Sequence, residues 1–301
     1  MRTLLFHRDY RSFTGGHLKV YQYFLHTQES ARFRPQIYFT PNSVRGPDNP
    51  WRAISSPPLE DWRPADAAVL FLAGLDWQAV PDPAPVPVIN LIQGVRHADP
   101  GDARHSYLAR PALRVCVSQE VADAIAATGM VNGPVHVIPN GIDFESIPTA
   151  PARDIEVLVA GLKNPALAVT VATRLRAAGL NVMLVTAWLP RSQFLALLSR
   201  TRVAVMLPMK HEGFYLPALE AMAAAAIVVC PDCVGNRGFC RDGETAFRPP
   251  YLPDDIVAAA MAASALPEPA RCAMRSAAVT ESRRHGLATE RAAFLRILDG
   301  M

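Results

Sequence analysis

The chain has 301 residues, of which 50% are hydrophobic and 19% charged, and this composition excludes a disordered or fibrous protein. Thirty lysines and arginines against 27 acidic residues give a net charge of +3, which is too weak for a dedicated nucleic-acid binder. The apolar runs are shorter than a membrane span, and charges interrupt the N-terminus at once. The sequence therefore predicts a cytoplasmic protein with no integral membrane segment, and it leaves peripheral membrane contact and the oligomeric state open.

Short apolar runs alternate with helix-length segments along the first half of the chain, a pattern typical of parallel α/β units. The six prolines of residues 41–64 favour a long connection there. Helices are expected at 16–27, 103–109 and 119–127, and strands at 3–7, 36–40, 67–73, 86–93, 113–118 and 135–139.

A polar, proline-marked break at residues 147–151 separates a second alternating series. Two such series predict an α/β protein made of two doubly wound domains that face one another, with ligands beyond the carboxyl ends of the strands. The second series has expected strands at 155–160, 182–186, 203–207 and 226–230, and expected helices at 165–178, 192–200, 217–225, 254–265, 269–281 and 289–298.

The common phosphate-binding motifs are missing from the sequence. No GxGxxG follows the first strand of either series, and neither a GxxxxGK[ST] loop nor an Asp-x-Asp pair occurs. One glycine pair, Gly15-Gly16, stands at the start of an expected helix, where backbone N–H groups could approach an anion. A tight turn with Thr14 as the N-cap is the alternative interpretation.

The five cysteines include one CxxC motif, Cys230 to Cys233. A redox CxxC requires the start of a helix, whereas Cys230 ends an expected strand and Cys233 opens a loop. A structural zinc ion requires four ligands, and Cys240 would supply only a third. The sequence therefore predicts structural thiols, with no metal site and no cofactor.

The most informative segment is residues 210–223. A strand ends before it, its loop carries Glu212 and Gly213, and a helix is expected to begin at Pro217. Glu220 is expected in the first turn, where a carboxylate also complements the helix dipole. Glu212 lies outside the helix and has no such explanation. Two carboxylates eight positions apart across a loop-to-helix turn suit a ligand rich in hydroxyl groups.

This segment resembles the E-x7-E motif of retaining GT-B glycosyltransferases, particularly family four. Residues 137–143 resemble that family's PNGxD segment, and residues 228–236 and 242–246 occupy the places of its PVVA…GG and DGxxG elements. The resemblance implies two facing Rossmann-like domains in a GT-B fold. Residues 1–148 would form the acceptor-side domain, 149–285 the nucleotide-sugar donor domain, and 286–301 a C-terminal helix that packs back on the first domain. The helix would bury Ala292, Phe294, Leu295 and Leu298.

The resemblance also implies a glycosyltransferase that moves a sugar from a nucleotide-diphosphate sugar to an unknown hydroxyl acceptor, with retention of configuration and without a metal. Glu220 would bind the ribose hydroxyls, and Glu212 would hold the transferred sugar. The family usually has an arginine where this chain has Leu162, so Lys163 is the expected phosphate cation. The other donor-binding residues implied are Gly15, Gly16, Asn164, Lys210, Gly213, Phe214, Tyr215 and Leu216.

A family histidine usually follows the fourth strand of the first domain. His97 is expected to take that place, as the group best able to bond sugar or acceptor hydroxyls, and Gln93 and Arg96 are the alternatives. His97, Lys163 and Glu212 thus form the expected catalytic set. Two other functions stay open, a GT-B nucleotide-sugar epimerase with acid/base carboxylates and a non-catalytic nucleotide-sugar-binding protein.

Overall fold

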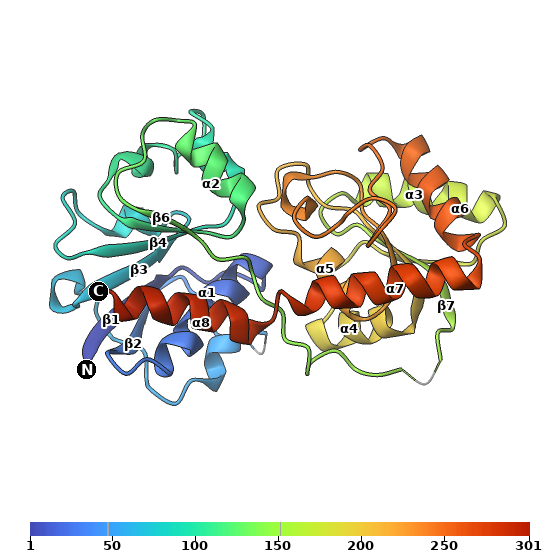
Figure 1. The fold of residues 1–301 in the computed structure, drawn as a ribbon. Helices are drawn as coiled ribbons and strands as arrows, with labels where there is room; N and C mark the ends of the chain where they lie inside the picture. Colours follow the sequence, from blue (N-terminus) through green and yellow to red (C-terminus); the bar gives the residue numbers. More distant parts are fainter. Residues whose placement is uncertain (47, 151) are drawn as a thin grey trace. The chain divides into compact units, whose positions relative to one another are not determined.

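A computed structural model describes residues 1–46, 48–150 and 152–301. It divides the chain into two compact units (Figure 1). Unit 1 comprises Met1–Asn140 and Ala288–Met301, and unit 2 comprises Gly141–Leu287. The expected connection at 41–64 and the expected break at 147–151 each include one residue, 47 and 151, that lies outside the described residues.

Unit 1 is built on a parallel sheet of six strands in the order β2-β1-β3-β4-β5-β6. Strands β3 and β4 are buried at every position, as expected where helices cover both faces of a parallel sheet. The strands are β1 (Arg2–Arg8), β2 (Phe33–Phe39), β3 (Val69–Ala73), β4 (Val88–Ile92), β5 (Leu113–Cys116) and β6 (Val135–Val137), and the α-helices are α1 (Gly15–Gln28), α2 (Gln119–Ala126) and α8 (Leu287–Asp299).

The C-terminal helix α8 packs against α1, as the sequence predicted (Figure 1). The ring of Phe294 contacts Tyr23 of α1 at 4.8 Å and Phe71 of β3 at 5.9 Å between ring centroids. Phe294 and Leu298 are buried and Leu295 is only half-buried, whereas Ala292 is exposed, so the prediction is wrong for Ala292. Residues two apart on a helix point to different sides, and Ala292 therefore cannot share the buried face of Phe294.

A buried charged cluster reinforces this contact between α1 and α8. The Glu290 carboxylate of α8 pairs with the Lys19 ammonium of α1, and Nε2 of His26 lies 3.1 Å from Glu290 Oε1. All three side chains are nearly inaccessible to solvent. Because a buried charge is stable only when it is paired, this cluster sets how α8 sits on α1.

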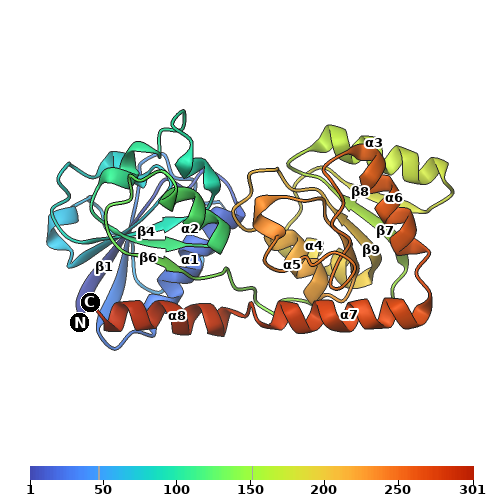
Figure 2. The same cartoon turned by 45° about the horizontal axis from the view of Figure 1, so that its top comes forward.

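Unit 2 has a parallel sheet of four strands in the order β10-β9-β7-β8, with helices on both faces (Figure 2). Apolar side chains of α4 and α5 fill one core cluster, and those of α3 and α6 fill another. The strands are β7 (Ile155–Ala160), β8 (Val182–Val185), β9 (Thr201–Met206) and β10 (Ile227–Val229), and the helices are α3 (Pro165–Ala177), α4 (Arg191–Arg200), α5 (Leu216–Ala223), α6 (Pro253–Ser264) and α7 (Glu268–Arg283).

The helix expected at 103–109 is wrong, because only a 3-10 turn forms there, at Ser106–Ala109. The side chains of Asp99 and Asp102 accept hydrogen bonds from backbone N–H groups two residues later, at Gly101 and Arg104. Such local turns compete with helix formation. Among the described residues, no helix combines the length and the apolar character that crossing a membrane demands.

Candidate functional site

The loops that follow β7 and β9 lie side by side in unit 2, because these two strands are paired in the sheet. They bring together two residues that the sequence placed in the site. Nζ of Lys163, after β7, lies 2.5 Å from Oε1 of Glu212, after β9. The Lys163 side chain is 50% exposed and that of Glu212 14% exposed, so the pair lies at the surface with the carboxylate on the inner side. This arrangement places a cation and a carboxylate at the end of the sheet where α/β proteins bind ligands.

The turn between β7 and α3 is held in place by tight packing. A Cβ atom at Gly161 would come within 2.4 Å of the Ala168 side chain, so only glycine fits this close approach of strand and helix. Asn164 caps α3 by accepting a hydrogen bond from the backbone N–H of Leu167. The predicted donor-binding residue Asn164 thus has a structural task that orients the turn carrying Lys163.

The Glu212 loop rests on the loop that follows β10. The backbone N–H of Tyr215 donates to the carbonyl of Gly235 at 2.8 Å. A Cβ atom at Gly235 would lie 2.6 Å from the backbone nitrogen of Phe214 and 2.8 Å from the carbonyl oxygen of Glu212. The second loop therefore fixes the backbone of Glu212 and Phe214, and glycine is required for the close approach.

The other predicted donor-binding residues of this loop have different surroundings. Gly213 is buried and Phe214 half-buried, its ring against Phe239 at 5.2 Å. Tyr215 and Leu216 are buried in the core of unit 2, so their side chains serve packing. Lys210 is exposed, with its ammonium 5.3 Å from the ring centre of Tyr251, an aromatic neighbour that the sequence reasoning missed.

Glu220 lies in the second turn of α5, not in its first turn, so the sequence placed it wrongly and a helix-dipole role does not explain it. Its side chain is only 3% exposed, and Oε1 lies 2.6 Å from Nη1 of Arg191, the first residue of α4. The sequence reasoning missed Arg191. Its one visible signal was a cation at the start of a helix, where the dipole disfavours positive charge.

Three of the cysteines lie in the core of unit 2, where they behave as structural thiols. Cys230, Cys233 and Cys240 are buried, and burial raises the pKa of Cys230, which keeps its thiol protonated. The Asn236 amide donates to the Cys230 sulfur at 3.1 Å. Over residues 1–46, 48–150 and 152–301, no cluster of three or more histidine, cysteine or acidic side chains has the arrangement that holds a metal ion.

In unit 1, the predicted glycines stand at the beginning of α1. The helix starts at Gly15, and the Thr14 hydroxyl caps it by accepting from the backbone N–H of His17 at 3.2 Å. The side chain of Gln93, directly after β4, donates from Nε2 to the Gly16 carbonyl at 3.3 Å. Gln93 therefore lies beside the glycine pair at the carboxyl end of the sheet.

His97 has a less accessible position than the sequence suggested. It is 5% exposed, and its Nδ1–H donates to the Gly94 carbonyl at 2.9 Å. Burial lowers the pKa of His97 to about 4, so the imidazole is neutral near pH 7. Within the described residues, Nε2 has no hydrogen-bond partner and is buried.

We expect the buried imidazole of His97 to make folding sensitive to acid. Its pKa of about 4 lies below the usual 6.5, so the unfolded chain binds the proton more readily between these values. The stability contributed by neutral His97 is complete above pH 6.5 and falls by about 2–3 kcal/mol as the pH drops to 4. Urea unfolding of the parent and His97→Gln across pH 4–7 measures the difference. Parallel stability curves would contradict the buried, neutral state.

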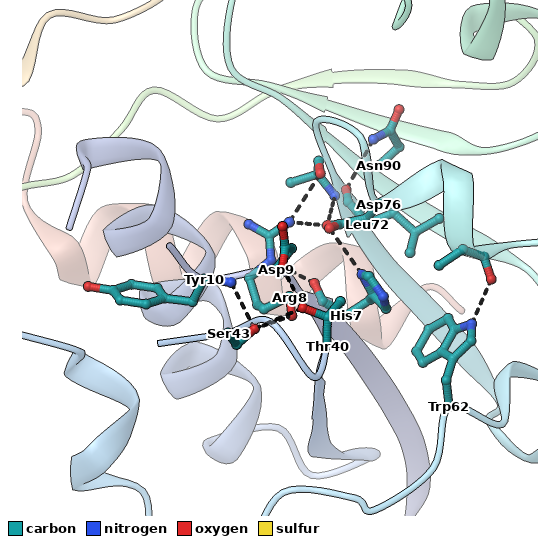
Figure 3. A network of polar contacts seen from close by, with 12 residues as sticks. His7, Arg8, Asp9, Tyr10, Thr40, Ser43, Trp62, Leu72, Asp76 and Asn90 are labelled. Carbon is teal, nitrogen blue, oxygen red and sulfur yellow. Dashed lines mark hydrogen bonds and ion pairs between the residues drawn. The ribbon is translucent and has the colours of Figure 1, made fainter. Parts of the chain in front are cut away.

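A buried polar network that the sequence reasoning missed lies at the carboxyl ends of β1 and β3 (Figure 3). Asp76 accepts a hydrogen bond from the Ala73 backbone N–H at 2.8 Å and also pairs with the Arg8 guanidinium. Nδ1 of His7 lies 3.2 Å from the same carboxyl group. Charged residues directly after an apolar strand were the available signal, and the network orders the loop after β3.

Comparisons with known proteins agree with the fold described above and with the family resemblance drawn from the sequence. Residues 143–266, which include Lys163, Glu212 and Glu220, match the family model described as glycosyl transferases group 1. No curated protein sequence matches the chain.

Similar solved structures cover both units. Sucrose-phosphate synthase from Thermosynechococcus elongatus is 12% identical, covers 100% of this chain and 99% of its own, and has a TM-score of 0.73. HepE from Anabaena in complex with UDP-glucose is 14% identical, with full coverage of both chains and a TM-score of 0.73. A glycosyltransferase from Rickettsia africae is 12% identical, covers 98% of this chain and 97% of its own, and has a TM-score of 0.69. These findings confirm the GT-B fold and the resemblance to group 1 glycosyltransferases drawn from the sequence.

Proposed function

We propose that this chain, whose residues 143–266 match the group 1 glycosyl transferases, transfers a hexose from a nucleoside-diphosphate sugar to an acceptor hydroxyl with retention of configuration. The observation that carries the proposal is the ion pair between Lys163 and Glu212 at the carboxyl end of the unit 2 sheet, where Nζ and Oε1 are 2.5 Å apart. A single site that offers a cation to a diphosphate and a carboxylate to hydroxyl groups suits a nucleotide-sugar donor.

Lys163 and Glu212 have separate tasks in this reaction. The bond between the anomeric carbon and the diphosphate oxygen breaks, and the acceptor oxygen bonds to the same face of that carbon. The acceptor proton passes to the departing phosphate. Negative charge grows on the leaving group, and the Lys163 ammonium stabilises it there. Glu212, backed by the Gly235 loop, accepts hydrogen bonds from the hydroxyls of the sugar.

For the histidine position of the family, the geometry favours Gln93 over His97. Gln93 lies against the start of α1, whereas His97 is buried and already donates to Gly94. We therefore assign the hydrogen bonds to sugar or acceptor hydroxyls to the Gln93 amide. In this proposal, Gly15 and Gly16 bind the donor through their backbone, because they stand at the start of α1, where the N–H groups favour an anion.

The proposal is tested by donor binding and turnover. UDP-glucose is the first donor to try, because HepE is described in complex with it. We expect UDP, GDP or ADP to raise the melting temperature, since a ligand at 100 times its Kd stabilises by about 2.7 kcal/mol. With the matching nucleotide sugar and a panel of acceptors, the free nucleoside diphosphate should be released. Binding without release would favour a non-catalytic binder, and interconversion of sugars an epimerase.

We expect sugar transfer to survive chelation. Lys163 supplies positive charge to the leaving diphosphate without a metal ion, and the sequence offers no Asp-x-Asp pair to hold one. The initial rate in excess EDTA should stay within about twofold of the rate without EDTA, because the lysine already provides the charge stabilisation. Activity lost on chelation and restored by manganese would overturn this metal-independent mechanism.

A further inference from the structure

Arg191 occupies a position that the stability of its own helix does not explain. It is the first residue of α4, where the helix dipole disfavours a cation, and no side chain caps that end. The other arginine at an end of α4 is Arg200, in the last turn, where the dipole favours positive charge. Arg200 pairs with Asp154, whose side chain is 55% exposed, and this is an ordinary surface pair.

The partner of Arg191, unlike the exposed partner of Arg200, is a buried carboxylate. The Glu220 carboxylate is 3% exposed, and its Oε1 lies 2.6 Å from Nη1 of Arg191. A carboxylate so deeply buried stays ionised only beside a positive charge or several hydrogen-bond donors. The Arg191 side chain is 27% exposed, so the pair lies at the edge of the core of unit 2, with the guanidinium on the solvent side of the carboxylate.

We propose that Arg191 is a positioning residue that holds the Glu220 carboxylate ready to accept hydrogen bonds from the ribose hydroxyls of the donor. This inference rests on the proposed function and on the role that the resemblance to family four implies for Glu220, which is to bind the ribose hydroxyls. The two oxygens of a carboxylate offer about four acceptor positions, enough for a guanidinium and two ribose hydroxyls together. A planar guanidinium fixes the plane of the carboxylate as well as its charge, and an orientation fixed in this way lets the site recognise the ribose 2′,3′-diol.

Calorimetry with the best-bound of UDP, GDP and ADP, and with its 2′-deoxy and 3′-deoxy analogues, tests the inference. The parent should bind the ribonucleotide about tenfold more tightly than at least one deoxy analogue. Arg191→Met should weaken ribonucleotide binding about tenfold and bring the ribo-to-deoxy affinity ratios toward one. Arg191→Lys should restore part of the ratio, because it returns the charge without the planar fork.

Arg200→Met, at the other end of the same helix, is the matched control and should leave the affinities and ratios unchanged. Equal losses for the ribo and deoxy ligands in Arg191→Met would overturn the inference, because a fold defect or a phosphate contact would explain them. Unchanged ratios in Arg191→Met beside lost ratios in Glu220→Ala would also overturn it and leave the proposed function intact. If the parent protein binds the ribo and deoxy ligands equally well, the assignment of Glu220 to the ribose hydroxyls is itself wrong.

In turnover, Arg191→Met should raise KM for the nucleotide sugar about tenfold and leave kcat within about threefold. Ribose hydroxyls are held equally before and during the reaction, so their loss removes uniform binding. A fall in kcat with unchanged KM would contradict a positioning role at the ribose.

Discussion

Lys163→Ala is expected to lower kcat for sugar transfer by about 10²–10³-fold, with a smaller change in KM for the donor. Charge accumulates on the leaving diphosphate as the glycosidic bond breaks, so a cation placed there stabilises the transition state more than the bound substrate. This chain has Leu162 where an arginine is usual in the family that it resembles, which leaves Lys163 as the cation of that turn.

The matched control for this variant is Arg174→Ala on the neighbouring helix α3. Arg174 pairs with Asp254, whose side chain is 90% exposed, so its removal should change neither kinetic constant appreciably. Lys163→Arg keeps the charge and should recover part of kcat. A double-mutant cycle with Glu212→Gln separates the diphosphate role from loss of the 2.5 Å pair. An increase in KM with unchanged kcat would show that Lys163 binds the substrate without assisting the reaction.

Glu220→Ala is expected to weaken binding of the nucleoside diphosphate by about 10–100-fold. The reason is the loss of charge-assisted hydrogen bonds from the ribose hydroxyls, each of about 1.5–3 kcal/mol. The measurement is calorimetry with the nucleoside diphosphate alone, since this ligand contains the ribose but no sugar. KM for the donor should rise by a similar factor, and kcat should change less.

Glu220→Gln is the control, because it keeps the shape of the side chain and one acceptor oxygen. It also leaves Arg191, whose side chain is 27% exposed, without a full charge partner, so thermal unfolding must accompany each titration. Folded Glu220→Ala protein that binds the nucleotide as tightly as the parent would show that Glu220 serves only the packing of α4 against α5.

The alternation of short apolar runs and helix-length segments determined the architecture from the sequence alone. Strands such as β7, expected at 155–160, lie where the pattern placed them, because a strand buried on both faces is mainly apolar, and in β7 only Glu156 interrupts the apolar run. The E-x7-E segment and the glycine pair at the start of α1 could also be identified from the sequence, because functional residues in loops at strand ends form short local patterns. The expected helix at 103–109 failed because side-chain turns at Asp99 and Asp102 outweigh a weak helical pattern.

Only the tertiary structure decided which side chains meet. Arg191 and Glu220 are 29 positions apart, and nothing local to either residue indicates their 2.6 Å contact across α4 and α5. The burial of His97 and the approach of Gln93 to Gly16 likewise depend on how β4 and α1 pack. Periodicity reports which face of an element is apolar, but burial and charge pairing depend on neighbours that packing brings from distant parts of the chain. For this reason the sequence singled out the Glu212 loop and Glu220, and the tertiary structure identified Arg191 as the partner of the buried Glu220 carboxylate.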